Sequence, residues 1–127
     1  MTVLDASAVI AWLKEEPGAA LVETALDSGQ AVISAVNLAE VLSRFRDAGH
    51  DPGQVMGDLA LSGLKTLGYG PQHAAQTALL RDDTRALGLS LGDRACLALG
   101  LERDAPVLTA DRTWAALTLP LTITLIR

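Results

Sequence analysis

The sequence predicts an α/β fold, in which a central parallel sheet lies between two layers of helices. Short apolar runs alternate with longer helical runs along the 127 residues, as in folds whose strands are connected by helices. The short runs are apolar throughout rather than alternating, which is typical of parallel strands that are buried on both faces. Right-handed crossovers place helices on both sides of such a sheet, so we expect a three-layer α/β/α sandwich.

Five short runs have the composition of strands. Aliphatic residues and threonine dominate them, and glycine or proline turns lie between many of them and the neighbouring helical runs. We expect strands at Thr2–Leu4, Ala31–Ile33, Thr66–Gly68, Val107–Thr109 and Thr122–Ile126.

Six longer runs have the composition of helices, several with clear amphipathic spacing. The clearest pattern places apolar side chains at i, i+3, i+4 and i+7, at Leu38, Val41, Leu42 and Phe45. We expect helices at Ala6–Lys14, Ala19–Asp27, Ala35–Arg46, Pro52–Leu64, Pro71–Leu87 and Ser90–Arg103, and a short helix or turn at Trp114.

The length and composition indicate one globular domain over residues 1–127. The only cysteine, Cys96, lies in the apolar run Ala95–Leu99, so we expect a small buried side chain and no disulfide. The N-terminus has no basic region before Asp5, which is unlike a signal peptide. No apolar stretch approaches the roughly 20 residues that span a bilayer. We therefore expect a cytoplasmic protein without membrane contact.

The net charge of −5 comes largely from four acids that are candidate site residues. Without Asp5, Glu40, Asp93 and Asp111, 11 acids face 10 bases. The remaining surface is therefore nearly neutral. This balance argues against a generic nucleic-acid-binding surface, which needs cations for phosphate contacts, and it restricts any nucleic-acid affinity to a local site.

Three of these acids lie at strand exits or helix starts. Asp5 directly follows the first strand, and Asp111 follows the strand Val107–Thr109. Asp93 completes a capping-box pattern that begins at Ser90. Each acid could simply cap a helix. However, the carboxyl ends of parallel strands share one edge of a sheet, where open α/β folds bind their ligands. We therefore expect these three side chains on one edge.

Glu40 lies inside the helix Ala35–Arg46 and caps nothing. The alternative to a site role is a solvated position, paired with Arg44 one turn later. Four clustered carboxylates would repel one another, and a hard cation such as Mg²⁺, which prefers oxygen ligands, relieves that repulsion. Such a metal can activate water and neutralise phosphate charge. Zinc is not expected, because two histidines and one cysteine show no zinc-ligand spacing.

Four short motifs carry a resemblance to a known family. In chain order they are Val3–Ala8 (VLDASA), Asn37–Val41 (NLAEV), Leu91–Ala95 (LGDRA) and Leu108–Asp111 (LTAD). Each motif is weak alone, but their order, spacing and fit to the chain length make the set specific. The chain resembles a PIN-domain ribonuclease, in particular the VapC-type toxin of a type II toxin–antitoxin pair, and the resemblance covers essentially the whole chain.

The resemblance implies a compact α/β/α sandwich and an endoribonuclease that hydrolyses RNA with Mg²⁺ or Mn²⁺. Asp5 and Asp93 would be the principal metal ligands, and Glu40 and Asp111 would complete the cluster directly or through water. Ser7 and Thr109 match the small hydroxyl positions beside the first and last acids. The resemblance also implies a homodimer and a cognate antitoxin that covers or occupies the acidic cleft.

Some alternatives remain open from the sequence. Arg44, Arg94 and Arg112 lie near the motifs and could contact phosphate or form surface ion pairs. The scaffold could also serve as a protein- or RNA-binding module without turnover. Phospho-accepting signalling domains and haloacid-dehalogenase-type phosphatases are disfavoured, because Asp5 lacks a second acid beside it or two residues later.

Overall fold

The computed structural model describes all residues from Met1 to Arg127 and contains a five-stranded sheet in the order β3-β2-β1-β4-β5. Every neighbouring pair of strands is parallel, which confirms the predicted sheet. The strands are β1 (Thr2–Leu4), β2 (Ala31–Ser34), β3 (Lys65–Leu67), β4 (Val107–Thr109) and β5 (Ile123–Leu125). The first strand lies at the centre, where Val3 pairs with Val32 on one side and Val107 on the other.

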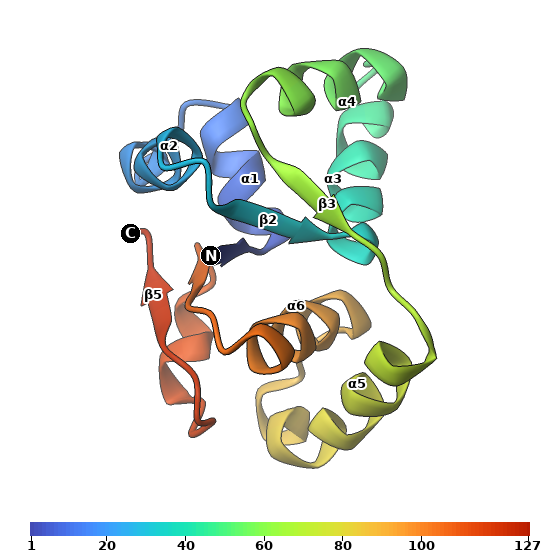
Figure 1. The fold of residues 1–127 in the computed structure, drawn as a ribbon, viewed down its shortest axis with the longest axis vertical. Helices are drawn as coiled ribbons and strands as arrows, with labels where there is room; N and C mark the ends of the chain where they lie inside the picture. Colours follow the sequence, from blue (N-terminus) through green and yellow to red (C-terminus); the bar gives the residue numbers. More distant parts are fainter.

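Helices cover both faces of the sheet, as the sequence predicts (Figure 1). One face carries α1 (Ala6–Leu13), α2 (Ala19–Asp27), α3 (Ala35–Asp47) and α4 (Pro52–Leu61). The other carries α5 (Pro71–Thr84), α6 (Leu91–Arg103) and the 3₁₀ turn η2 (Arg112–Ala116). Each face has its own apolar core, because alternate strand residues point to opposite sides: Val3 joins the α6 core and Leu4 joins the α1 core.

Several predicted boundaries were wrong by a few residues. The fourth helix ends at Leu61 and not at Leu64, because Gly63 adopts a left-handed conformation (φ 89°) that leaves the helix. The fifth helix ends at Thr84 and continues as the 3₁₀ turn η1 (Arg85–Leu87), which Gly88 terminates with φ 64°. The third strand lies one residue earlier than predicted, at Lys65–Leu67, because its pairing with the second strand begins with Lys65 beside Val32 and ends with Leu67 beside Ser34.

Smaller shifts occur at five other elements. The first helix ends at Leu13, the second strand extends to Ser34, the third helix extends to Asp47 and the last strand is shortened to Ile123–Leu125. The sixth helix begins at Leu91, because Ser90 is its cap.

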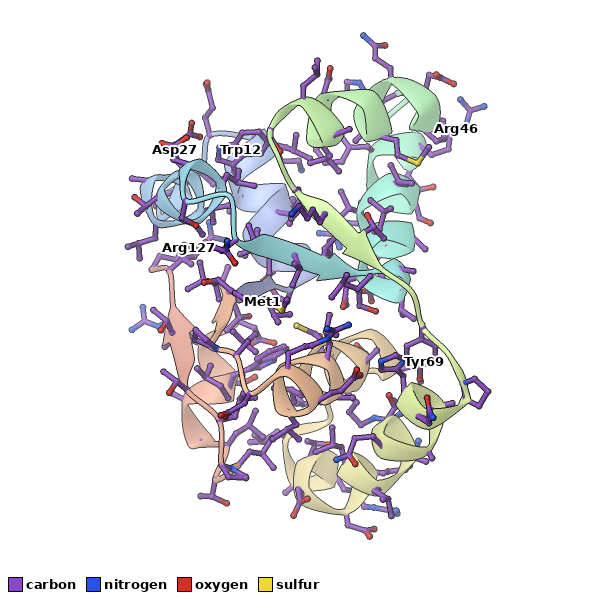
Figure 2. All side chains as sticks on the ribbon, viewed as in Figure 1. Met1, Trp12, Asp27, Arg46, Tyr69 and Arg127 are labelled. Carbon is purple, nitrogen blue, oxygen red and sulfur yellow. The ribbon has the colours of Figure 1, made fainter.

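The largest buried side chains come from both cores and include Trp114, Leu4, Ile33 and Leu97. Cys96 is fully buried in the α6 core, as the sequence predicts, and burial raises the pKa of its thiol. All side chains are drawn in Figure 2, where Trp12 and Asp27 lie at the α1–α2 end of the molecule. None of the helices combines the length and apolar character that a bilayer crossing requires.

Gly18 is a position where the fold requires glycine, which yields a stability prediction. Its φ is 94°, and a Cβ would lie 2.5 Å from the backbone oxygen of Ile126. We expect Gly18→Ala to lower the free energy of unfolding by about 2 kcal/mol, through backbone strain and displacement of the C-terminal segment. Urea unfolding followed by circular dichroism measures this.

Gly57→Ala is the matched control, because Gly57 lies inside α4 with open space where a Cβ would be. This change should raise the free energy of unfolding by up to about 1 kcal/mol, since alanine is the better helix former. Equal stability of Gly18→Ala and wild type would contradict the prediction.

Candidate functional site

The four predicted acids meet at one pocket of about 180 Å³. They reach it from four elements: Asp5 follows β1, Asp111 follows β4, Asp93 lies in the first turn of α6, and Glu40 lies in α3. The other lining residues are Ala6, Ser7, Ile10 and Arg44. The expectation that Asp5, Asp93 and Asp111 share one edge of the sheet is therefore confirmed in the structure, and Glu40 reaches the same pocket.

Asp5 is the most buried acid of the pocket, with 3% of its surface exposed. Its carboxylate accepts hydrogen bonds from the Ala8 backbone N–H (2.8 Å), the Ser7 hydroxyl (2.8 and 2.9 Å) and the Thr109 hydroxyl (2.6 Å). Burial raises the pKa of Asp5 to about 6; the three donors oppose this shift, and the negative charge of Asp93 adds to it.

Two hydroxyl groups connect the loops that follow β1 and β4. The Thr109 Oγ1 donates to Asp5 and accepts from the backbone N–H of Asp111 at 3.0 Å. The Ser7 Oγ likewise donates to Asp5 and accepts from the backbone N–H of Ala110 at 2.9 Å. These bonds hold the backbone at Ala110 and Asp111, which follows β4, against the Asp5 side chain, which follows the neighbouring strand β1.

Glu40 is held by a contact between α3 and the start of α6. The Asn37 Nδ2 donates to Glu40 Oε2 and to the Gly92 carbonyl oxygen, both at 2.9 Å. A Cβ at Gly92 would collide with the Glu40 carboxylate, so glycine leaves the space that this side chain occupies. Glu40 forms no ion pair with Arg44, so the pairing that the sequence offered as an alternative is wrong.

Asp93 and Asp111 serve as helix caps and also line the pocket. Asp93 Oδ2 accepts from the Ser90 N–H (3.0 Å) in a capping box, and Asp111 Oδ1 accepts from the Thr113 N–H (3.0 Å) and hydroxyl (2.7 Å). The capping and site interpretations are therefore compatible. The second oxygen of each carboxylate, like Oε1 of Glu40, accepts no hydrogen bond from the protein.

The pocket has the donor chemistry of a hard cation, although the metal remains a prediction. Its candidate ligands are carboxylates with three oxygens free of protein donors, and it contains neither histidine nor cysteine. In the conformation observed, no three such side chains are arranged to ligate one ion directly. Mg²⁺ usually keeps several waters and takes only one or two carboxylates, so the residues present fit it.

The three arginines near the motifs have different environments. Arg44 is exposed and lines the pocket, and Arg112 is exposed beside Asp111. Arg94 is only 6% exposed, and its Nη1 donates to the Thr77 carbonyl oxygen of α5 at 3.0 Å. The possibility that Arg94 contacts phosphate is therefore wrong, because its guanidinium joins two helices inside the protein.

The roles of Asn37 and Gly92 were not predicted from the sequence, although both residues lie within the four motifs. Asn37 is 1% exposed and precedes Glu40 by three residues, so the two side chains share a helix face. This spacing could have indicated the contact. No local signal pointed to Gly92, because the contact depends on how α3 and α6 pack.

Comparison with known proteins identifies related sequences and folds. The sequence model of one family, described as PIN domain, matches residues 2–118. No curated protein matches the chain significantly. A toxin–antitoxin complex from Klebsiella pneumoniae contains a chain with a TM-score of 0.76 and 19% identity, and the alignment covers 100% of this chain and 98% of that chain.

Two further solved structures share the fold. DNA-bound VapBC from Salmonella typhimurium has a TM-score of 0.73 at 17% identity, over 99% of this chain and 98% of that chain. A VapC toxin from Mycobacterium tuberculosis, described as cleaving the sarcin–ricin loop, has a TM-score of 0.70 at 12% identity. The alignment covers 93% of this chain and 97% of that chain. At such low identities these matches establish the fold alone, and they confirm the predicted α/β/α architecture.

The raised pKa of Asp5 predicts how stability depends on pH in the metal-free protein. The native carboxyl has a pKa of about 6, against 3.8 in the unfolded chain. The native state thus holds its proton more tightly, and the stability that Asp5 contributes is present below pH ~4 and is lost as pH rises through ~6. We expect this loss to be about 3 kcal/mol, at roughly 1.4 kcal/mol per pKa unit.

Urea unfolding at several pH values with EDTA tests this for wild type, Asp5→Asn and Asp58→Asn. The Asp5→Asn variant should not show the loss of stability between pH ~4 and ~6 that the carboxyl group causes. Asp58→Asn, an exposed position on α4, should keep the wild-type profile. Parallel curves for wild type and Asp5→Asn would contradict the assignment.

Proposed function

Because this chain belongs to the PIN domain family, we propose that it is a metal-dependent endoribonuclease and the toxin of a toxin–antitoxin pair. The observation that carries this proposal is the convergence of Asp5, Glu40, Asp93 and Asp111 on one pocket. The acids come from four elements, and separate hydrogen bonds position each one.

In this proposal Asp5 and Asp93 hold a Mg²⁺ or Mn²⁺ ion, and Glu40 and Asp111 complete the site directly or through water. Such an ion supplies an activated water and neutralises charge on the phosphodiester. The protein contributes orientation: Thr109 and Ser7 fix Asp5, and Asn37 fixes Glu40. With a pKa of about 6, Asp5 is mostly ionised at neutral pH, as metal binding requires.

The substrate and partner proposals draw on the structural relatives. One relative is described as an RNA-cleaving toxin and another as part of a toxin–antitoxin complex, which supports RNA as substrate and an antitoxin as partner. We also propose a homodimer, because two-fold dimers are the commonest assembly among soluble oligomers. An RNA substrate is consistent with action in the cytoplasm.

RNA cleavage by antitoxin-free protein tests the proposal. Wild type with Mg²⁺ or Mn²⁺ should give a small set of fragments, and EDTA should abolish them. Asp93→Asn should lower the rate by about 100-fold or more, because losing a metal ligand removes several kcal/mol of charge stabilisation. Asp58→Asn, which changes net charge equally at an exposed site on α4, should cleave like wild type.

Two results would contradict the proposal. One is a folded wild-type protein that cleaves no RNA under any divalent metal. The other is cleavage that persists in EDTA and in Asp93→Asn, as from a contaminating nuclease. If calorimetry also detected no metal binding, the alternative would be favoured, in which the scaffold binds protein or RNA without turnover.

Gly92→Ala separates activity from stability in the same assay. The new methyl group would displace the Glu40 carboxylate, which is the far end of a flexible side chain, while the backbone stays in place. We expect the free energy of unfolding to change by less than about 1 kcal/mol and cleavage to fall about 10- to 100-fold, as when a residue that orients a metal ligand is lost.

Glu40→Gln is the reference for the loss of the Glu40 carboxylate in this experiment. Gly57→Ala is the matched control, because this substitution also adds a methyl group within a helix. Gly92→Ala should resemble Glu40→Gln in activity. Cleavage by Gly92→Ala at the rate of Gly57→Ala would show that the position of Glu40 does not matter.

A further inference from the structure

A second depression, of about 550 Å³, adjoins the acidic pocket. Glu40 and Arg44 line both, so the two hollows meet at these side chains. The walls of the second hollow come from the outer face of α3, with Val36 and Ser43, and from the start of α6, with Leu91. A chain that enters the acidic pocket can therefore continue into this hollow past Arg44.

Arg44 is the only cation that lines the acidic pocket, and it is exposed. The ion pairs of the chain are His73–Glu102, Arg103–Glu102 and Arg127–Glu16, so Arg44 has no carboxylate partner despite its neighbours. A guanidinium presents a planar fork of donors that suits phosphate. The position of Arg44 thus offers a phosphate contact next to the acids.

The second hollow is better suited to bind a nucleoside than to bind a second phosphate group. Leu91 is 59% exposed there, and the hydroxyls of Ser43 and Ser90 provide polar groups. The hollow has no aromatic side chain on which a base could stack. Leu91 can therefore make apolar contacts with a base and its ribose, and the two serine hydroxyls can hydrogen-bond the polar edge of the base. Unpaired RNA can present a splayed nucleotide in this way.

A second copy of the chain fits this surface less well. A two-fold pairing places the same patch of both copies together. Each copy would bring four carboxylates and one arginine to the contact, so both patches are net negative and repel each other. An RNA strand is complementary to Arg44, and the cation of the proposed function would offset the repulsion between its phosphates and the four carboxylates.

We infer that Arg44 binds the RNA phosphate next to the scissile one, and that the hollow beside Leu91 holds the adjoining nucleoside. This inference rests on the proposed ribonuclease function and adds the direction in which the substrate strand leaves the acidic pocket. Arg44 is a binding residue in this scheme, so its removal should weaken substrate capture more than turnover.

The first test compares Arg44→Gln with Arg46→Gln in steady-state cleavage of a single-stranded RNA at several salt concentrations. Arg46 is the matched control, because it is exposed on the same helix but lies at the outer end of α3, near α4 (Figure 2). We expect Arg44→Gln to lower kcat/KM about tenfold, mainly through KM, as for one lost charged contact. The slope of log kcat/KM against log salt should become shallower by about 0.7.

Arg46→Gln should change kcat/KM less than about twofold. Arg44→Lys keeps the charge and loses the planar fork of donors. It should retain the salt slope of wild type and have a KM between those of wild type and Arg44→Gln.

If wild type cleaves RNA and the two glutamine variants behave alike, the inference is overturned and the ribonuclease function stands. If wild type cleaves nothing, the ribonuclease proposal fails. The two variants are then compared by anisotropy of labelled single-stranded RNA with Mg²⁺, where equal affinities overturn the inference.

Leu91→Ser tests the nucleoside part, with Leu61→Ser as control because Leu61 is 89% exposed on α4. We expect a severalfold higher KM for Leu91→Ser only, with the molar mass in sedimentation equilibrium unchanged. A lower molar mass for Leu91→Ser, with KM unchanged, would show that this surface is an interface between copies and would overturn the nucleoside assignment.

Discussion

The buried carboxylate of Asp5 is the constraint on which the rest of the site depends. It lies at the end of the central strand, where removal from water disfavours its charge and raises its pKa. The hydroxyls of Ser7 and Thr109 and one backbone N–H partly compensate for that loss. Thr109 reaches Asp5 only because β4 pairs beside β1 in parallel, so the strand order of the sheet is also a condition for the acidic pocket.

The pocket lies where the two helical layers meet beyond the sheet edge. Glu40 comes from α3 on one face, and Asp93 comes from α6 on the other. The two helices contact each other there, and the Asn37 amide joins them by donating to Glu40 and to the Gly92 carbonyl. Glycine at position 92 lets the carboxylate lie close to the α6 backbone. The spacing of the acids therefore depends on the packing of two layers and not on one loop.

Helix capping and metal binding are often weighed as competing explanations for an acid at a strand exit or helix start, but the carboxylates of Asp93 and Asp111 can serve both. Asp93 and Asp111 each use one oxygen to cap backbone N–H groups, which leaves the other oxygen without a protein donor. The caps fix the side chains before any ligand arrives, which reduces the entropy lost on binding. The clustering of like charges and the burial of Asp5 oppose folding, so the cation that we propose would stabilise the folded protein on binding.

The sequence by itself determined the layers, nearly all elements and the four acids, because apolar periodicity, caps and strand exits are local signals. Helix ends at Leu61 and Thr84 were misjudged, since left-handed glycines and 3₁₀ turns interrupt runs that remain helical in composition. Only the tertiary structure decided that Asn37 meets Gly92, 55 residues later, and that Arg94 is buried while Arg44 is exposed at the pocket. These outcomes depend on which helix faces pack together across the sheet edge, and that packing joins residues that no local pattern connects.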